Sequence, residues 1–460
     1  MGIPPPQASV RAVSVLPEGY AEMLYNPCRT PPERPAKFLS GSPSSKPDPI
    51  RTEGYRSFPS FSFGRGLKVK LKQVIPNIAL DGMSRQVFSN AVILEGDDLE
   101  LTRGYIVVRK GIVEKIAEGS PPGRATDIKH GFILPPFINA HTHIVDSIAK
   151  ERYLGKTQPK VVGPSGEKFK ALNSSPLKDI IASTTATLSD MLRTGTLAHC
   201  DFREGGIAGI GIIKQLPRTP VRSIVLGRPT NLKELPKVLD RGDGVGVPSL
   251  DAFEPDELLE IARQTRRAKK LLAVHAAETK KAQEISMRYS GWSEVKLAVE
   301  LGSSFVVHAT HATKQDFILL RKKRIPVVFC PRANNLLSVG NPPLHLALTT
   351  EVKFCLGTDN TMVCQPNMFE ELSFAWASLR SSTPSAGSEE ARALLRSATV
   401  EPIKLFDLPW TPIKEGERAT FMILARRDNL LNISDVYSGL VNRARADNLR
   451  AICVNGKLIS

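Results

Sequence analysis

The sequence is poor in cysteine and in aromatic side chains. Its 460 residues include six cysteines, none of which forms a Cys-x-x-Cys pair, and aromatic residues make up 6% of the chain. The cysteine spacing therefore indicates neither a closed cysteine-rich metal site nor a framework of disulfide bonds. We expect the protein to reside in a reducing, cytoplasmic environment.

Long hydrophobic runs are also lacking, and the first residues do not show the basic-then-apolar order of a secretory signal. A net charge of +16 favours contact with nucleic acid or acidic surfaces. Because the basic residues are scattered and aromatics are few, we interpret the charge as a solvated surface. We expect a small-molecule substrate, no specific nucleic-acid partner and no membrane; a homodimer stays open.

The two ends of the chain differ from its middle in composition and in hydrophobic periodicity. Residues 1–66 hold 12 of the 35 prolines and show little periodicity, which predicts a disordered extension. Short alternating segments in residues 67–130 predict strands, and residues 413–460 repeat this pattern. We therefore expect both ends to contribute to one small β-sandwich-like domain.

Between these ends, short apolar runs alternate with stretches of helical periodicity, as in a parallel sheet with helical crossovers. Eight such units predict a (β/α)8 TIM barrel over residues 131–412, with its chemistry at the carboxyl ends of the strands. The eight runs are residues 131–143, 195–202, 221–229, 244–249, 271–278, 304–311, 325–334 and 353–360.

Histidine and carboxylate side chains fall at the ends of four of these runs. His141 and His143 are two positions apart, so on an extended segment both imidazoles point to the same side. His275 and Asp359 end two later runs. Two or three histidines with one carboxylate leave a coordination position open, which is typical of a catalytic metal site. Taken alone, Asp359 is equally compatible with a helix cap.

Four motifs carry a resemblance to a known family. With them, residues 67–460 resemble the amidohydrolase superfamily, and within it the mononuclear branch of cytosine deaminases, guanine deaminases and chlorohydrolases. The motifs are Pro135-Pro-Phe-Ile-Asn-Ala-His-Thr-His143, His275-Ala-Ala-Glu278, His308-Ala-Thr-His311 and Gly357-Thr-Asp-Asn360.

The resemblance implies one divalent ion, zinc or iron, and a set of catalytic side chains. Glu278 is similar to the proton shuttle of the deaminases, and His308 and Asp359 would orient the water that attacks the substrate. His308 either orients water or completes the metal shell. A solvated glutamate is the alternative for Glu278. The implied metal ligands are His141, His143, His275 and Asp359.

One absence favours a single metal ion. Binuclear members of the superfamily bridge two metals with a carboxylated lysine from a middle strand, but residues 221–229 and 244–249 contain no lysine. The chain also lacks the His-x-Glu and Pro-Cys-x-x-Cys motifs of the unrelated cytidine deaminase fold.

We therefore predict a metal-dependent hydrolase that deaminates a nucleobase-like, amino-substituted heterocycle. Hydrolysis of another C–N bond, such as a cyclic amide, or of a C–Cl bond on the same centre stays open, as does a non-catalytic basic binding protein. Arg203 and Glu204 are candidate substrate-binding residues, since an arginine there suits an anionic group. An arginine–carboxylate pair that braces the loop is the alternative.

Overall fold

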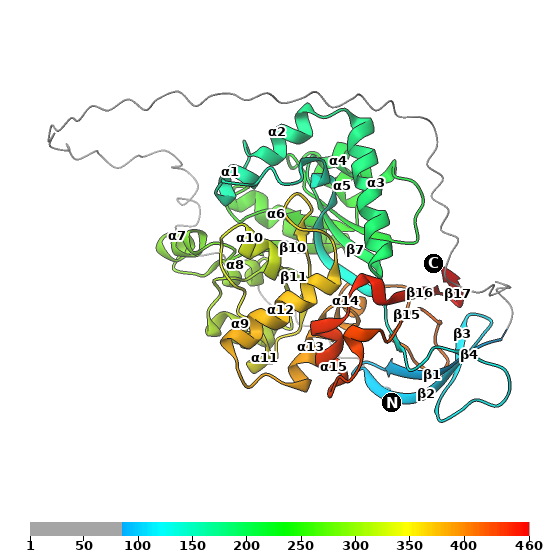
Figure 1. Ribbon diagram of the computed structural model, residues 1–460. Helices are drawn as coiled ribbons and strands as arrows, with labels where there is room; N and C mark the ends of the chain where they lie inside the picture. Colours follow the sequence, from blue (N-terminus) through cyan, green and yellow to red (C-terminus); the bar gives the residue numbers. More distant parts are fainter. Residues whose placement is uncertain (1–84, 460) are drawn as a thin grey trace, which may run out of the picture. The chain divides into compact units, whose positions relative to one another are not determined.

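The computed structural model describes residues 85–459, which contain two separate β-sheets (Figure 1). The disordered extension predicted for residues 1–66 lies outside the described residues. So do residues 67–84 of the predicted β-domain.

Parallel strands form the larger sheet, and this sheet closes on itself. β14 pairs with β6 and continues β13 after two residues, so β13 and β14 together make the eighth strand. Each predicted run contains one strand of this sheet, which confirms the α/β barrel. The strands are β6 (Phe137–His143), β7 (Thr196–Arg203), β8 (Arg222–Gly227), β9 (Gly244–Val247), β10 (Leu271–Ala276), β11 (Phe305–His308), β12 (Val327–Phe329), β13 (Phe354–Leu356) and β14 (Asp359–Asn360).

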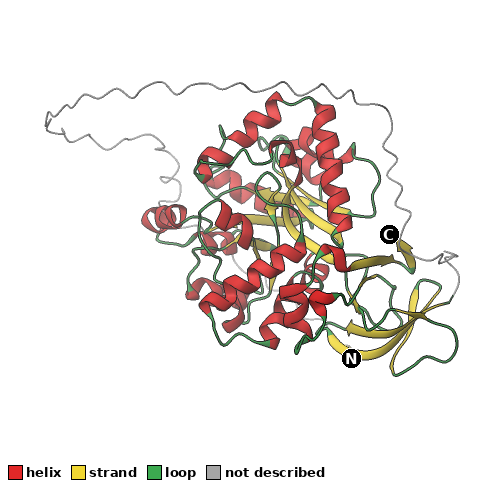
Figure 2. Cartoon of the chain, viewed as in Figure 1, coloured by secondary structure: helices red, strands yellow, loops and turns green. Residues whose placement is uncertain are grey.

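The helices lie around these strands (Figure 2). The strands are covered on both faces, and every residue of β6 and β7 is buried. Within residues 85–459, no helix has both the length and the hydropathy needed to cross a bilayer. The helices up to the last barrel strand are α1 (Gln158–Val162), α2 (Glu167–Ser174), α3 (Leu177–Arg193), α4 (Gly206–Lys214), α5 (Leu235–Arg241), α6 (Pro255–Arg267), α7 (Lys280–Ser290), α8 (Glu294–Glu300), α9 (Lys314–Lys323), α10 (Pro331–Leu336) and α11 (Leu344–Thr349).

Strands from both ends of the described chain form the second sheet. β15 pairs with β5 on one side and with β16 on the other, so early and late segments lie side by side, as predicted. The order is β17-β16-β15-β5-β1-β2-β3, and β4 also pairs with β1. Its strands are β1 (Gln86–Glu95), β2 (Glu100–Arg109), β3 (Ile112–Glu118), β4 (Thr126–Asp127), β5 (Phe132–Leu134), β15 (Phe421–Leu424), β16 (Leu449–Val454) and β17 (Lys457–Ile459).

The run at residues 131–143 is divided between the two sheets. Its first part is β5 of the small sheet and its second part is β6 of the barrel. Pro135 and Pro136 stand between them, and proline has no backbone N–H for a sheet ladder. The chain therefore passes from one sheet to the other at these two residues. Helices α12 (Met368–Ser382), α13 (Ser388–Ser397) and α14 (Val400–Leu405) lie between the last barrel strand and β15, and α15 (Val436–Arg443) lies between β15 and β16.

Candidate metal centre

The predicted metal ligands lie together at the carboxyl ends of their strands. His141 Nε2 is 3.2 Å from Asp359 Oδ1, and His143 Nε2 is 3.5 Å from the same oxygen. His275 Nε2 is 3.3 Å from His141 Nε2. All four side chains are buried. Strands β6, β10 and β14 thus bring three imidazoles and one carboxylate to one point.

The hydrogen bonds of two of these imidazoles leave the Nε2 atoms free to bind a cation. His275 Nδ1 donates to the Val247 carbonyl at 2.8 Å, and His143 Nδ1 donates to Glu204 Oε1 at 2.9 Å. The bond to a carbonyl assigns the proton to Nδ1 in His275. For His143 the same tautomer follows from the contact with Glu204, which is shorter than the 3.3 Å from Lys168 Nζ to this nitrogen. Burial lowers the pKa of His141 and His275 and lowers that of His143 to about 3. The neutral imidazole is the form that binds metal.

The donor set fits a divalent ion. When His275 Nδ1 donates to Val247, His275 Nε2 carries no proton, and it faces His141 Nε2 at 3.3 Å. Asp359 Oδ1 lies 3.2 Å from the same His141 nitrogen, so a cation among these atoms would be held by two imidazoles and a carboxylate. Burial acts to raise the pKa of Asp359, but the contact with His141 and the nearby imidazoles of His308 and His143 together outweigh burial and hold this pKa well below its usual range. His141 and Asp359 also form a group of suitable size with His308. Nitrogen donors with one carboxylate suit zinc or iron.

The backbone around the centre has several residues in the left-handed region. Ala277, His308, Ala309 and Asp359 have φ values of 51°, 73°, 47° and 59°. Residues other than glycine rarely adopt this backbone conformation, and those that do are frequent at functional sites. Gly357 lies between β13 and β14 and permits their close approach to β6. A Cβ at this position would lie 2.6 Å from the backbone nitrogen of His141.

Glu278 lies beside this centre, three residues after His275. Its Oε2 is 4.0 Å from His308 Nε2, and its Oε1 accepts a hydrogen bond of 3.2 Å from Gln158 Nε2 of α1. Burial raises the pKa of Glu278 above its ordinary value, against the opposing charge of His308. Its side chain is 19% exposed, so this carboxyl retains access to a substrate.

The two histidines at the end of β11 and just beyond it face different partners. His308 turns toward the centre, and its Nδ1 lies 3.1 Å from Asn334 Oδ1. His311 Nε2 donates instead to the Val339 carbonyl at 2.6 Å. Of the two, His308 is therefore the histidine that lies beside the candidate metal ligands.

Arg203 and Glu204 lie at the end of β7, buried and in contact with each other. The Arg203 guanidinium is also 3.6 Å from Asp201 and 3.8 Å from Asp146. These contacts match the alternative of an arginine–carboxylate pair that braces the loop. A direct contact of either residue with substrate stays a prediction.

Two residues near the centre carried no recognisable signal in the sequence. Gln158 and Lys168 both come from residues 144–176, an irregular excursion between β6 and α3 that holds a 3-10 helix and two short α-helices. Gln158 contacts Glu278, and Lys168 contacts Glu204 and Asp146. No periodicity or motif in this excursion indicates either contact.

Comparison with known proteins agrees with the geometry. Residues 132–459 match the Amidohydrolase family. The chain is 31% identical over 363 residues to an uncharacterized protein of Methanocaldococcus jannaschii, an alignment that covers 76% of this chain and 93% of the relative. It is 24% identical to the 5-methylthioadenosine/S-adenosylhomocysteine deaminase of Pyrococcus furiosus, over 81% of this chain and 94% of that protein. An adenosine deaminase from Xanthomonas campestris with bound zinc shares the fold, with a TM-score of 0.68, 16% identity and coverage of 81% and 92%.

Proposed function

Because the chain belongs to the amidohydrolase family, we propose that it is a mononuclear metal-dependent deaminase of amino-substituted, nucleobase-like heterocycles. The observation that carries the proposal is the meeting of three imidazoles, one aspartate and Glu278 at one buried point. A metal binder without catalysis has no need of a carboxyl at Glu278 with a raised pKa beside the ligands.

His141, His143, His275 and Asp359 would hold the ion. When bound there, a divalent metal supplies Lewis acidity, which makes water a nucleophile near neutral pH. The protein provides the orientation: the Val247 carbonyl and Glu204 fix two of the imidazole rings by their Nδ1 protons.

Glu278 would move the protons. It accepts one from the attacking water and gives it to the ring nitrogen next to the amino-bearing carbon, which makes that carbon more electrophilic. The water oxygen would form a bond to this carbon, and the second proton of the water would pass to the amino nitrogen by way of Glu278. The C–N bond then breaks, which releases ammonia and leaves the oxo-substituted ring. Each positioned proton transfer contributes about a hundred- to ten-thousand-fold in rate. Gln158 holds the Glu278 carboxyl in place through Oε1, and His308 lies on the side of Oε2.

The names of related proteins guide the choice of substrate. A relative at 24% identity deaminates 5-methylthioadenosine and S-adenosylhomocysteine, by its name, and a protein of the same fold is an adenosine deaminase. We therefore place 6-aminopurines and their nucleosides first among the heterocycles to test.

Ammonia release from a panel of aminopurines, aminopyrimidines, pterins and triazines tests this function. We expect release from at least one aminopurine by the zinc-loaded protein, loss of that release on chelation, and recovery when zinc is returned. The same protein preparations are also assayed for chloride release from chlorotriazines and for ring opening of cyclic amides. Turnover of only these last substrates would replace deamination by one of the other hydrolyses that share the centre.

A further inference from the structure

A cluster of buried charges lies directly behind His143, and the proposed proton transfers do not use it. It contains three cations and three carboxylates, so its formal charge is zero. Apart from Arg228, whose side chain is 24% exposed, all of its members are buried. They are Lys168, Arg203, Arg228, Asp146, Asp201 and Glu204.

Lys168 occupies the centre of this cluster. It comes from α2, and its Nζ is 2.8 Å from Asp146 Oδ2, in contact with Glu204 Oε1, and 3.3 Å from His143 Nδ1. Only 4% of the side chain is exposed. An ammonium group has three protons and no lone pair, so it can donate to both carboxylates at once.

The groups around Lys168 are of the types that bind cations. One ligand atom each of His143, Asp146 and Glu204 lies within 4.8 Å of the other two, and all three residues are buried. Asp146 Oδ1 has no hydrogen-bond partner although it is fully buried. Without the ammonium, the buried cluster would contain three carboxylates and two guanidinium groups, and this deficit of one positive charge favours uptake of another cation.

The cluster also acts on the metal ligand itself. Glu204 accepts the Nδ1 proton of His143, and this bond turns His143 Nε2 toward Asp359 and the other ligands. Lys168 and Arg203 also contact the Glu204 carboxylate, so two buried cations surround the acceptor of this proton.

We propose that Lys168 is a positioning residue whose ammonium fills the place of a second cation beside His143, so that the centre accepts a single divalent ion. The inference rests on the metal centre of the proposed function. It also gives a structural reason for one ion in place of two: the second position is occupied by a charge that belongs to the protein.

Zinc titration of the purified protein tests the inference. Wild type should bind about one equivalent, whereas Lys168→Ala should bind about two, the second held by Asp146 and Glu204. Lys168→Arg keeps the positive charge and should return to one equivalent. Lys170→Ala is the matched control, because Lys170 lies on the same helix but is exposed and pairs only with Glu167 at 2.9 Å.

Removal of a carboxylate identifies the second site. Lys168→Ala combined with Glu204→Gln restores the formal neutrality of the cluster, and the extra equivalent of zinc should disappear. A folded Lys168→Ala protein that binds one equivalent through a large excess of zinc would overturn the inference. A wild type that binds no metal would instead overturn the proposed function.

Thermal unfolding keeps the test decisive if Lys168→Ala is unstable. Zinc beyond the first equivalent should raise its melting temperature and should leave those of wild type and Lys168→Arg unchanged. The double variant with Glu204→Gln should melt above Lys168→Ala in the absence of excess zinc. If neither excess zinc nor Glu204→Gln raises the melting temperature of Lys168→Ala, Lys168 does not serve as a cation in this position.

Discussion

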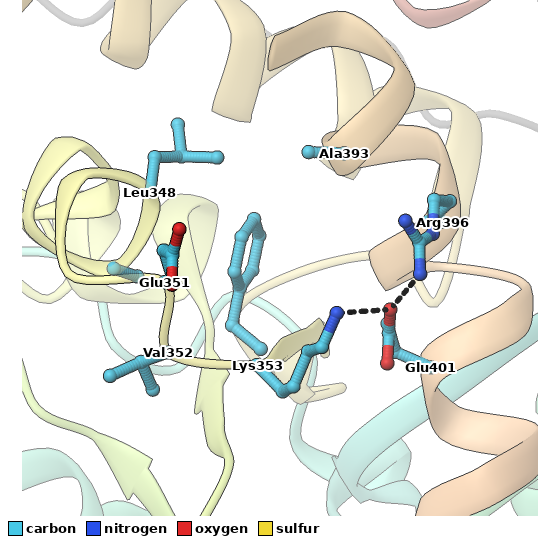
Figure 3. A pocket seen from close by; sticks show the side chains of 9 residues that line it. Leu348, Glu351, Val352, Lys353, Ala393, Arg396 and Glu401 are labelled. Carbon is cyan, nitrogen blue, oxygen red and sulfur yellow. Dashed lines mark hydrogen bonds and ion pairs between the residues drawn. The ribbon is translucent and has the colours of Figure 1, made fainter. Parts of the chain in front are cut away.

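Two lysine–glutamate pairs lie at opposite ends of the barrel strands. Lys168 and Glu204 meet beyond the carboxyl ends, where both are buried. Lys353 precedes β13 at the amino end, and its Nζ is 3.6 Å from Glu401 Oε1 while 66% of its side chain is exposed. Figure 3 shows this second pair beside a hollow of about 140 Å³, with Arg396 also bound to Glu401 at 2.7 Å.

The residue types are the same, so the difference between the pairs comes from their surroundings. Water and salt screen the pair at the amino end, and its loss costs little. At the carboxyl end both partners are removed from water, and loss of Lys168 would leave the buried cluster with one more carboxylate than cations. Buried charge is retained in this barrel next to the candidate metal centre, where the strand ends also place the histidines.

The largest effect is expected from the metal ligands. Asp359→Ala removes the carboxylate that contacts both His141 and His143, so the zinc content should fall from about one equivalent to none and turnover to background. Metal analysis and ammonia release measure the two losses. Asp97→Ala is the control, because Asp97 is exposed and pairs with Lys404 on the surface. Full zinc content in Asp359→Ala would remove Asp359 from the ligand set.

Glu278→Gln should separate catalysis from metal binding. Glutamine retains the size of Glu278 and its contact with Gln158, but it cannot accept a proton and pass it on. We expect kcat to fall by about a hundred-fold or more with KM and zinc content nearly unchanged. Glu284→Gln, on the exposed side of α7, is the control. A variant that keeps most of its kcat would make Glu278 a solvated carboxyl without a catalytic role.

A buried carboxyl behind Glu278 predicts a pH-dependent stability. Glu294 accepts a 2.7 Å hydrogen bond from the backbone nitrogen of Ala277, and burial raises its pKa to about 7. Because the unfolded chain releases this proton at a lower pH than the fold does, the free energy of unfolding should decrease as the pH rises toward 7.

Glu294→Gln removes this titration and retains an oxygen that can accept from Ala277. Between about pH 5 and about pH 8, the free energy of unfolding of the variant should rise by roughly 2 kcal/mol relative to that of wild type. Urea unfolding at several pH values measures the difference, with Glu284→Gln as a pH-independent reference. If the difference in free energy of unfolding between Glu294→Gln and wild type is the same at every pH, this carboxyl does not titrate between pH 5 and pH 8.

The barrel and its donor set were predictable because both leave local traces in the sequence. Each strand is a short apolar run, and the candidate ligands follow such runs directly, so their register placed them at one end of the sheet. The spacing of His141 and His143 indicates a shared side of a strand without any knowledge of their partners. The division of the first run was less visible, although Pro135 and Pro136 mark it.

The charged cluster was not predictable because its contacts join segments that share no pattern. Lys168 lies in an irregular excursion, and its partner Glu204 is 36 residues away. In sequence, Lys168 and Lys170 are equivalent lysines of one short helix. Tertiary packing alone buries the first and exposes the second. For Arg203 the sequence left two alternatives, and the carboxylate contacts that match one of them are seen only in the folded chain.

The smallest effect is expected at the amino end of the barrel. Lys353→Ala removes a long ion pair from a side chain that is mostly in water, and Arg396 still neutralises Glu401. The free energy of unfolding should change by less than about 1 kcal/mol, and the change should shrink further as salt is added. Zinc content and kcat should equal those of wild type. Urea unfolding at low and high salt, run in parallel with Lys168→Ala, measures the contrast directly. If the two lysine variants lost similar stability, burial would not be what distinguishes the two ends of the barrel.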